Sequence, residues 1–219
     1  MEWRERDGVE WLQAELPGAT AIFSTRSAGS VKADPRPLAA ALGLEPERIA
    51  HARQVHGAAL VLEPDPGEQP EADGHVLTEP GLAGMVFVAD CLPVAVAGPG
   101  GVAILHCGWR GLAAGIVAQG VEAVGATHAA IGPGIGPCCY EVGSEVLESF
   151  AGLGDGVAEG KMLDLPEVAR RRLREAGVER VESAGLCTRC EPELFFSHRR
   201  EAAEAGRQAG LAWLDGEDG

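Results

Sequence analysis

Three side chains in the sequence are of types that bind a borderline-soft metal ion, and each follows an apolar run or a short turn. They are His56, Cys91 and His106. Two imidazoles and a thiolate suit Zn²⁺ or Cu²⁺, and three protein ligands leave a fourth position open, as in a catalytic zinc site. Zinc in such a site acidifies water to a pKa of about 7 and supplies hydroxide at neutral pH. The set is therefore a candidate for a catalytic metal site, although its spacings are a weak signal and match no compact zinc-finger pattern.

The same three residues allow other interpretations. Cys91 could act as a nucleophile with His106 or His56 as its base, which would make the protein a Cys–His hydrolase. The histidines could also be core-edge residues beside a buried cysteine. A separate, non-enzymatic alternative is a binding module that captures a nucleoside or phosphate through the glycine-rich loops. Metal analysis, thiol alkylation and a turnover assay would separate these alternatives.

Two arginines are candidates for holding an anion. Residues 106–111, HCGWRG, lead from an expected strand into an expected helix, where glycines and a helix N-terminus favour a bound anion. Arg110 lies in this turn and could grip a phosphate or carboxylate with two hydrogen bonds. Arg26 is the second choice, because it also ends a strand-like run. The alternative for the turn is a tight strand–helix connection with a surface arginine.

The chain has six cysteines, of which four lie outside this set or its flanks. Cys187 and Cys190 form a CxxC motif, which allows a redox site, a zinc site or a disulfide within the motif. Cys138 and Cys139 could complete four thiols for a second, structural metal. A lone CxxC is a weak signal, and no thioredoxin-like βαβ unit surrounds this one. A buried free cysteine behaves as a small hydrophobe. We therefore expect these thiols to be structural, with one metal ion per chain and no second one.

The elements that must position the candidate ligands form a hairpin. Residues 98–101 (GPGG) predict a turn between two valine-rich strands, Leu92–Ala97 and Val102–Leu105, and a further strand, Met85–Ala89, precedes them. If paired residues sum to about 199, His106 lies opposite Pro93, two residues from Cys91. An offset of two keeps both side chains on one face, about 7 Å apart. The hairpin thus delivers a cysteine and a histidine to one end.

Elsewhere, apolar patterns predict a mixture of strands and short helices. The expected strands are Val9–Leu16, Ala19–Ser24, Ala58–Leu62, His75–Thr78, His128–Ile131, Val178–Ser183 and Leu211–Leu214. The expected helices are Pro37–Leu42, Pro46–Ala52, Gly111–Val124, Ser144–Phe150 and Pro166–Ala176, the last with Asp164 as its N-cap. No long linker divides the chain, so we expect one α+β sandwich domain over residues 1–219.

Composition narrows the class of protein. A hydrophobic fraction of 46% is that of a globular chain, and a net charge of -15 argues against nucleic acid or an anionic membrane as a partner. No apolar run approaches the roughly 20 residues of a membrane span, and the N-terminus lacks the apolar segment of a signal peptide. We expect a cytoplasmic protein that acts on small molecules.

Together with their flanking residues, the candidate ligands resemble a known family. The matching segments are FSTR (23–26), QVHG (54–57), ADG (72–74), ADCLP (89–93), HCGWRG (106–111), IGPGIGPCCYEVG (131–143), CT (187–188), FFSHRR (195–200) and GR (206–207). In this order they resemble the bacterial laccase-domain family, formerly called multicopper polyphenol oxidoreductases and now regarded as purine nucleoside phosphorylases. Some members are also linked to peptidoglycan editing.

The resemblance implies a single-domain four-layer αββα sandwich of the cysteine-hydrolase-like type, with a metal, usually zinc, on the residues matching His56, Cys91 and His106. It also implies phosphorolysis of adenosine, inosine, guanosine and methylthioadenosine, with adenosine deamination as a side activity. In this interpretation purine nucleosides and phosphate are the ligands, Arg110 and Arg26 hold phosphate, and Gln54 contacts the base.

Two features qualify the resemblance. The segment after FSTR is shorter than the glycine-rich segment usual in the family, so substrate preference could differ. The chain has only six histidines, too few for the copper centres of a four-copper laccase. A single copper ion, which would make the protein an oxidoreductase acting on phenols, still fits the ligand types, with Met85 as a candidate axial ligand.

Overall fold

The computed structural model describes residues 1–216 and consists mainly of two six-stranded sheets packed face to face. Small and branched apolar side chains from both sheets fill the space between them. In sheet order, the first sheet comprises β1 (Glu2–Arg6), β2 (Val9–Leu16), β3 (Ala19–Ser24), β14 (Gln208–Leu214), β7 (Ala83–Val88) and β4 (Ile49–His51).

The second sheet contains the hairpin expected from the sequence. In sheet order its strands are β13 (Arg180–Ser183), β10 (His128–Ile131), β8 (Leu92–Gly98), β9 (Gly101–Cys107), β6 (Gly74–Leu77) and β5 (Leu60–Leu62). The pairs Pro93–His106 and Gly98–Gly101 both sum to 199, so the predicted register of β8 and β9 is confirmed. This pairing places the residue before β8, Cys91, close to the end of β9.

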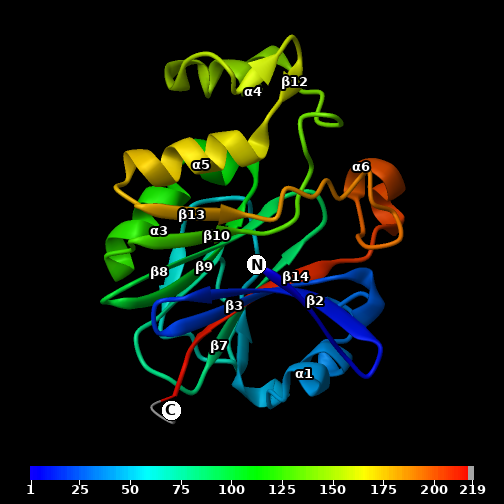
Figure 1. The fold of residues 1–219 in the computed structure, drawn as a ribbon, viewed down its shortest axis with the longest axis vertical. Coiled ribbons are helices and arrows are strands. Elements are labelled where there is room, and N and C mark those ends of the chain that lie inside the picture. The colour runs from blue at the N-terminus through cyan, green and yellow to red at the C-terminus, as the bar shows by residue number, and fades with distance from the viewer. Residues whose placement is uncertain (217–219) are drawn as a thin grey trace.

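Helices cover the outer faces of both sheets (Figure 1). Helix α1 (Arg36–Leu42) packs on the first sheet, while α2 (Trp109–Ala113), α3 (Ile116–Val124) and α5 (Leu165–Glu175) pack on the second. Smaller elements are α4 (Ser144–Glu148), α6 (His198–Glu201), the two-stranded pair β11 (Ala158–Glu159) and β12 (Met162–Leu163), and 3₁₀ turns at Arg26–Ala28, Pro46–Arg48, Ala151–Leu153 and Ala202–Glu204. The expected α+β class is confirmed.

The two sheets approach each other most closely at glycines. A Cβ atom on Gly84 of β7 would lie 2.8 Å from the Cβ of His75 in β6, and one on Gly210 of β14 would lie 2.5 Å from the Cβ of Pro93. Real Cβ atoms essentially never come so near to other heavy atoms, so the absence of a side chain at both positions sets the spacing of the sheets.

Two local predictions are wrong, and one strand was missed. Residues 46–52 were expected to be helical, but Pro46 begins only a 3₁₀ turn and Ile49–His51 then pairs in parallel with β7. The helix expected over Gly111–Val124 begins two residues earlier and is broken at Gly115, whose φ of 88° ends α2. Strand β1 was missed because all five of its residues are exposed and show no apolar alternation.

Within residues 1–216, no helix combines the length and the apolar character that crossing a bilayer requires.

Candidate metal centre and ligand cavity

The structure brings the three candidate ligands together. One ligand atom from each of His56, Cys91 and His106 lies within 4.8 Å of the others. The two imidazole rings meet edge to face, with centroids 4.8 Å apart. His106 is buried in β9, Cys91 is half-buried just before β8, and His56 is exposed in a loop. The hairpin and one loop therefore supply a group of donors that one metal ion could reach.

The loop that carries His56 is held by a carboxylate that the sequence did not single out. Asp73 is fully buried, and its carboxylate accepts hydrogen bonds from the backbone N–H groups of Val55 (3.2 Å), His56 (2.9 Å) and Gly57 (2.6 Å). These bonds stabilise a turn in which His56 has a φ of 61°, a left-handed conformation that is uncommon for a residue with a side chain.

The same carboxylate orients the buried histidine. Asp73 Oδ1 lies 2.8 Å from His106 Nδ1, so Nδ1 carries the proton of this bond and Nε2 is left to face Cys91 and His56. Carboxylates commonly fix metal-binding histidines in this way. Asp73 lies in the ADG segment of the family pattern, but its role depends on two distant contacts that no local spacing reveals.

Charge within the centre favours the thiolate. Burial by itself raises the pKa of Cys91, but the charge of His106 and hydrogen bonds from both histidines outweigh it and lower that pKa. For His106 burial acts in the opposite direction and lowers the pKa, but the Cys91 thiolate and Asp73 outweigh it and raise the pKa overall. Burial also raises the pKa of Asp73, yet the hydrogen bond to His106 and those from the loop amides lower it overall. The thiolate that a metal requires is thus accessible near neutral pH.

The three residues lie in the wall of a cavity of ≈ 890 Å³. Its described lining has five cationic side chains: Lys32, Arg53, Arg110, Arg199 and Arg207. Asp90 is the single carboxylate in that lining, and its oxygens are engaged by the Thr188 hydroxyl (2.7 Å) and the Arg199 backbone N–H (2.7 Å). Arg53 is paired with Glu71, but the other four cations form no salt bridge with a described residue. In a chain of net charge -15, this concentration of positive charge favours an anionic ligand.

Two of these arginines pair with aromatic rings. The guanidinium of Arg110 lies 4.8 Å from the ring centroid of Trp109, and that of Arg199 lies 5.1 Å from the ring of Tyr140. All four residues line the cavity. Arg199 and Tyr140 were not identified from the sequence, although both lie within family segments. Helix α2 has only five residues, so the expected helix-terminus contribution to anion binding has little structural basis.

The other two sequence candidates occupy different positions. Gln54 lines the cavity, but its side chain is engaged by the backbone of Phe87. Its NH₂ group donates to the Phe87 carbonyl at 2.9 Å, and its side-chain oxygen accepts from the Phe87 N–H at 2.7 Å. Arg26 is not part of the cavity lining. Its guanidinium contacts the Pro192 carbonyl and Glu201 and lies 4.6 Å from the ring centroid of Phe196.

Comparison with known proteins identifies the family. The family model described as "Multi-copper polyphenol oxidoreductase laccase" matches residues 23–215. The chain belongs to this family. The resemblance inferred from the sequence segments is thereby confirmed.

Similar members of this laccase family have been named for an activity on nucleosides. "Purine nucleoside phosphorylase YfiH" of Escherichia coli (strain K12) is 37% identical over 189 residues, covering 80% of this chain and 77% of that protein. A "Purine nucleoside phosphorylase" of Deinococcus radiodurans is 36% identical over 247 residues, covering 97% and 96%. The crystal structure of YlmD from Geobacillus stearothermophilus has a TM-score of 0.86 and 30% identity, covering 98% and 99%.

The donors of this family member fit one metal ion. A His₂Cys set with an oriented imidazole and an accessible thiolate suits zinc or copper. Among residues 1–216, the other group of at least three metal-binding side chains consists of four cysteines. The described residues therefore contain no second cluster with histidine, as the copper sites of a four-copper laccase would require.

Proposed function

We propose that this protein is a metal-dependent purine nucleoside phosphorylase with adenosine deaminase side activity. The substrates are adenosine, inosine, guanosine and methylthioadenosine, and the products of phosphorolysis are the base and the ribose 1-phosphate. The observation that supports this best is the cavity, in which a metal-binding His₂Cys set faces an excess of arginine and lysine side chains. The names of the relatives point to the same reaction.

Phosphorolysis breaks the bond between C1′ and the purine nitrogen while a phosphate oxygen bonds to C1′. The phosphate must be held as an anion against the sugar, and the leaving purine must gain a proton. Arg110 and Arg199 serve as the phosphate grip because charge-assisted, two-pronged hydrogen bonds both orient and stabilise such an anion. Tyr140 and Trp109 provide aromatic faces on which a purine can lie.

His56, Cys91 and His106 hold the metal, as zinc or alternatively copper, and Asp73 keeps His106 in the required tautomer. When bound there, the ion supplies Lewis-acid chemistry suited to an attack of water on C6 of adenosine. Gln54 acts on the cavity indirectly, by fixing β7 through its two bonds to Phe87. No phosphate-binding role is assigned to Arg26, because it lies outside the lining. The reaction needs only small-molecule partners, and we place it in the cytoplasm.

A Cys–His hydrolase is the second candidate, because the pKa of Cys91 is lowered beside His106 as it is in thiol nucleophiles. The two functions respond differently to metal removal. A thiol hydrolase keeps its activity without metal and loses it on alkylation, whereas the phosphorylase needs the metal back.

The test is a measurement of adenosine turnover by the full chain with and without phosphate, joined to metal analysis. We expect adenine and ribose 1-phosphate only when phosphate is present, inosine as a lesser product, and loss of both activities on chelation. Consumption of adenosine at the same rate without phosphate, or no turnover by zinc-loaded protein with phosphate, would contradict the proposal.

A further inference from the structure

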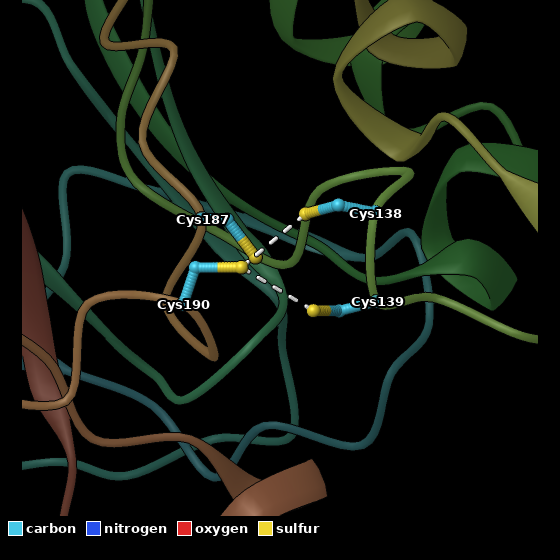
Figure 2. A group of neighbouring side chains, drawn as sticks. All are labelled: Cys138, Cys139, Cys187 and Cys190. Atoms are coloured by element: carbon cyan, nitrogen blue, oxygen red, sulfur yellow. Dashed lines mark hydrogen bonds between the residues drawn. The ribbon is translucent and has the colours of Figure 1, made fainter.

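A second group of potential metal ligands lies outside the centre described above. The sulfur atoms of Cys138, Cys139, Cys187 and Cys190 are all within 4.8 Å of one another (Figure 2). Cys190 Sγ lies 3.5 Å from Cys138 Sγ and 3.4 Å from Cys139 Sγ. The two pairs come from segments about 50 residues apart in the sequence, so the fold itself brings them together.

Both segments are shaped into turns that direct their sulfurs to one point. The CxxC segment forms a tight turn that begins at Cys187, because the backbone N–H groups of Cys190 and Glu191 both donate to the Cys187 carbonyl at 3.1 Å. In the other segment, the N–H of Cys139 donates to the carbonyl of Gly136 at 3.0 Å. An isolated parallel β-bridge between Gly134 and Cys187 joins the two segments through their backbones.

The surroundings leave room for sulfur atoms and donate to them. The backbone N–H of Gly136 donates to Cys187 Sγ at 3.3 Å, which favours a thiolate at that position. A Cβ atom on Gly136 would lie 3.3 Å from Cys187 Cβ and 3.5 Å from Cys138 Sγ. The glycine therefore provides both a hydrogen bond and the free space beside the cluster.

The sulfur separations suit a tetrahedral metal site better than disulfides. With Zn–S bonds of about 2.3 Å, the sulfurs of a tetrahedron lie about 3.8 Å apart, close to the separations found here. A disulfide requires about 2.05 Å, and Cys190 is almost equally near to two partners although it can bond to only one. Four thiols at these distances can be ionised together only around a cation, and a set of four soft sulfurs selects zinc or iron.

We propose that Cys138, Cys139, Cys187 and Cys190 bind one Zn²⁺ as a closed four-thiolate site. Binding releases to solvent the protons of those thiols that are still protonated, and Zn²⁺ with four thiolates has a net charge of -2. The sequence had favoured structural thiols without a second metal, but it could not show that the two pairs converge. This site shares no ligand with the His56, Cys91 and His106 centre, and four protein ligands leave no position for a substrate.

The zinc site would hold together two segments that form part of the cavity wall. One segment continues into Tyr140, and the other leads through Thr188, which bonds to Asp90, toward Arg199. Arg199 Nη1 also donates to the Glu141 carbonyl at 2.9 Å, so the segments meet again at the cavity wall. Closing a long loop by a metal restricts the unfolded chain and holds this wall in place.

The test counts zinc in full-length chains reconstituted with Zn²⁺ in reducing buffer and then desalted. The Cys91→Ser variant lacks a ligand of the first centre, and we expect it to retain about one zinc per chain. Adding Cys187→Ser and Cys190→Ser should remove that zinc. Cobalt in the Cys91→Ser variant should show the strong sulfur-to-metal absorption of a tetrahedral thiolate site. A Cys91→Ser chain that is folded by circular dichroism but holds neither metal would overturn the proposal.

A second measurement needs no variant that could fail to fold. In the wild-type chain, maleimide labelling of the exposed thiols Cys138 and Cys190 should slow by more than about 10-fold when zinc is bound, because a coordinated thiolate is a poorer nucleophile. Mass spectrometry of the peptides would locate the labels. Equal labelling with zinc and with a chelator would show that these cysteines do not form a zinc site.

Discussion

Asp73 connects the two halves of the candidate metal centre. One carboxylate holds three backbone N–H groups of the loop around His56 and also the ring of His106. The candidate ligands were accessible to sequence reasoning because histidine and cysteine are recognisable types at the ends of predicted elements. Asp73 was not, because an aspartate before a strand has many other uses and its partners are 16 to 33 residues away.

Replacing Asp73 by Asn should weaken metal binding at this centre without removing a ligand. The neutral amide is a poorer partner for His106 Nδ1–H and can point its NH₂ group at the loop amides, so we expect zinc affinity to fall about 10- to 100-fold. Competition with a chromophoric chelator measures this affinity. The zinc bound by the Cys91→Ser chain is subtracted, so that only zinc at the His56, Cys91 and His106 centre is counted. Asp65→Asn, in an exposed loop, is the control. Unchanged affinity would show that His106 needs no such partner.

The phosphate grip and the metal should be separable at Arg110. We expect Arg110→Ala to lower phosphorolysis by more than about 10-fold, which corresponds to a lost charged hydrogen bond of at least ~1.4 kcal/mol. Adenosine deamination should fall less, because no phosphate takes part in it. Rates of adenine and inosine formation, compared with those of the exposed Arg174→Ala control, report the two activities. Equal losses in a folded variant would remove Arg110 from the phosphate site.

Individual elements differ in how well their sequence specified them. Strands β2, β3, β8 and β9 were predicted with nearly their true limits because valine-rich or alternating runs are bounded by Gly-Pro turns. The exposed strand β1 and the short strand β4 were missed, since only their pairing with neighbouring strands makes them strands. The four cysteines show the same limit, because their convergence depends on β10 and β13 lying side by side.

Strand β6 contains a buried histidine that should make the protein sensitive to acid. His75 lies between the sheets, its Nδ1 has no hydrogen-bond partner among the described residues, and burial lowers its pKa from 6.5 to about 4. Between these two pH values, His75 is protonated in the unfolded chain but stays neutral in the folded one. Stability therefore falls as the pH drops from 6.5 toward 4, by about 3 kcal/mol.

Replacing His75 by Leu should reduce the loss of stability between pH 6.5 and pH 4. Urea unfolding of metal-free protein at several pH values between 4 and 7 gives the slope of the unfolding free energy. We expect a smaller slope in His75→Leu and an unchanged one in the half-buried control His128→Gln. If His75→Leu kept the wild-type slope, the acid sensitivity would have to come from other groups.

At the scale of the whole molecule, two glycines set how closely the two sheets pack. Gly84 and Gly210 lie where opposite strands come into contact, and neither could have been assigned this role from sequence, because a glycine within a strand pattern has several explanations. Their positions show that the sheets pack closely where β7 and β14 face β6 and β8.

Gly84→Ala should therefore destabilise the protein, although Gly→Ala within a strand usually helps. The added methyl would meet His75 Cβ at 2.8 Å and Ile104 Cγ2 at 3.0 Å, so the sheets must shift. We expect a loss of about 1–3 kcal/mol in the free energy of unfolding, measured by urea titration. Gly152→Ala, where the new methyl meets nothing within 4 Å, is the matched control. Equal stability of the two variants would show that the contact between the two sheets accommodates the added methyl group without loss of stability.

The place of β14 has a consequence for how the chain matures during synthesis. Gln208–Leu214 pairs with β3 on one side and β7 on the other, at the centre of the first sheet (Figure 1). Until these residues leave the ribosome, the facing edges of β3 and β7 have no partner and are open to pairing with other chains. Nascent polypeptides in which Gln208–Leu214 has not yet emerged should therefore depend on chaperones, and the cavity can take its final shape only after β14 has been inserted.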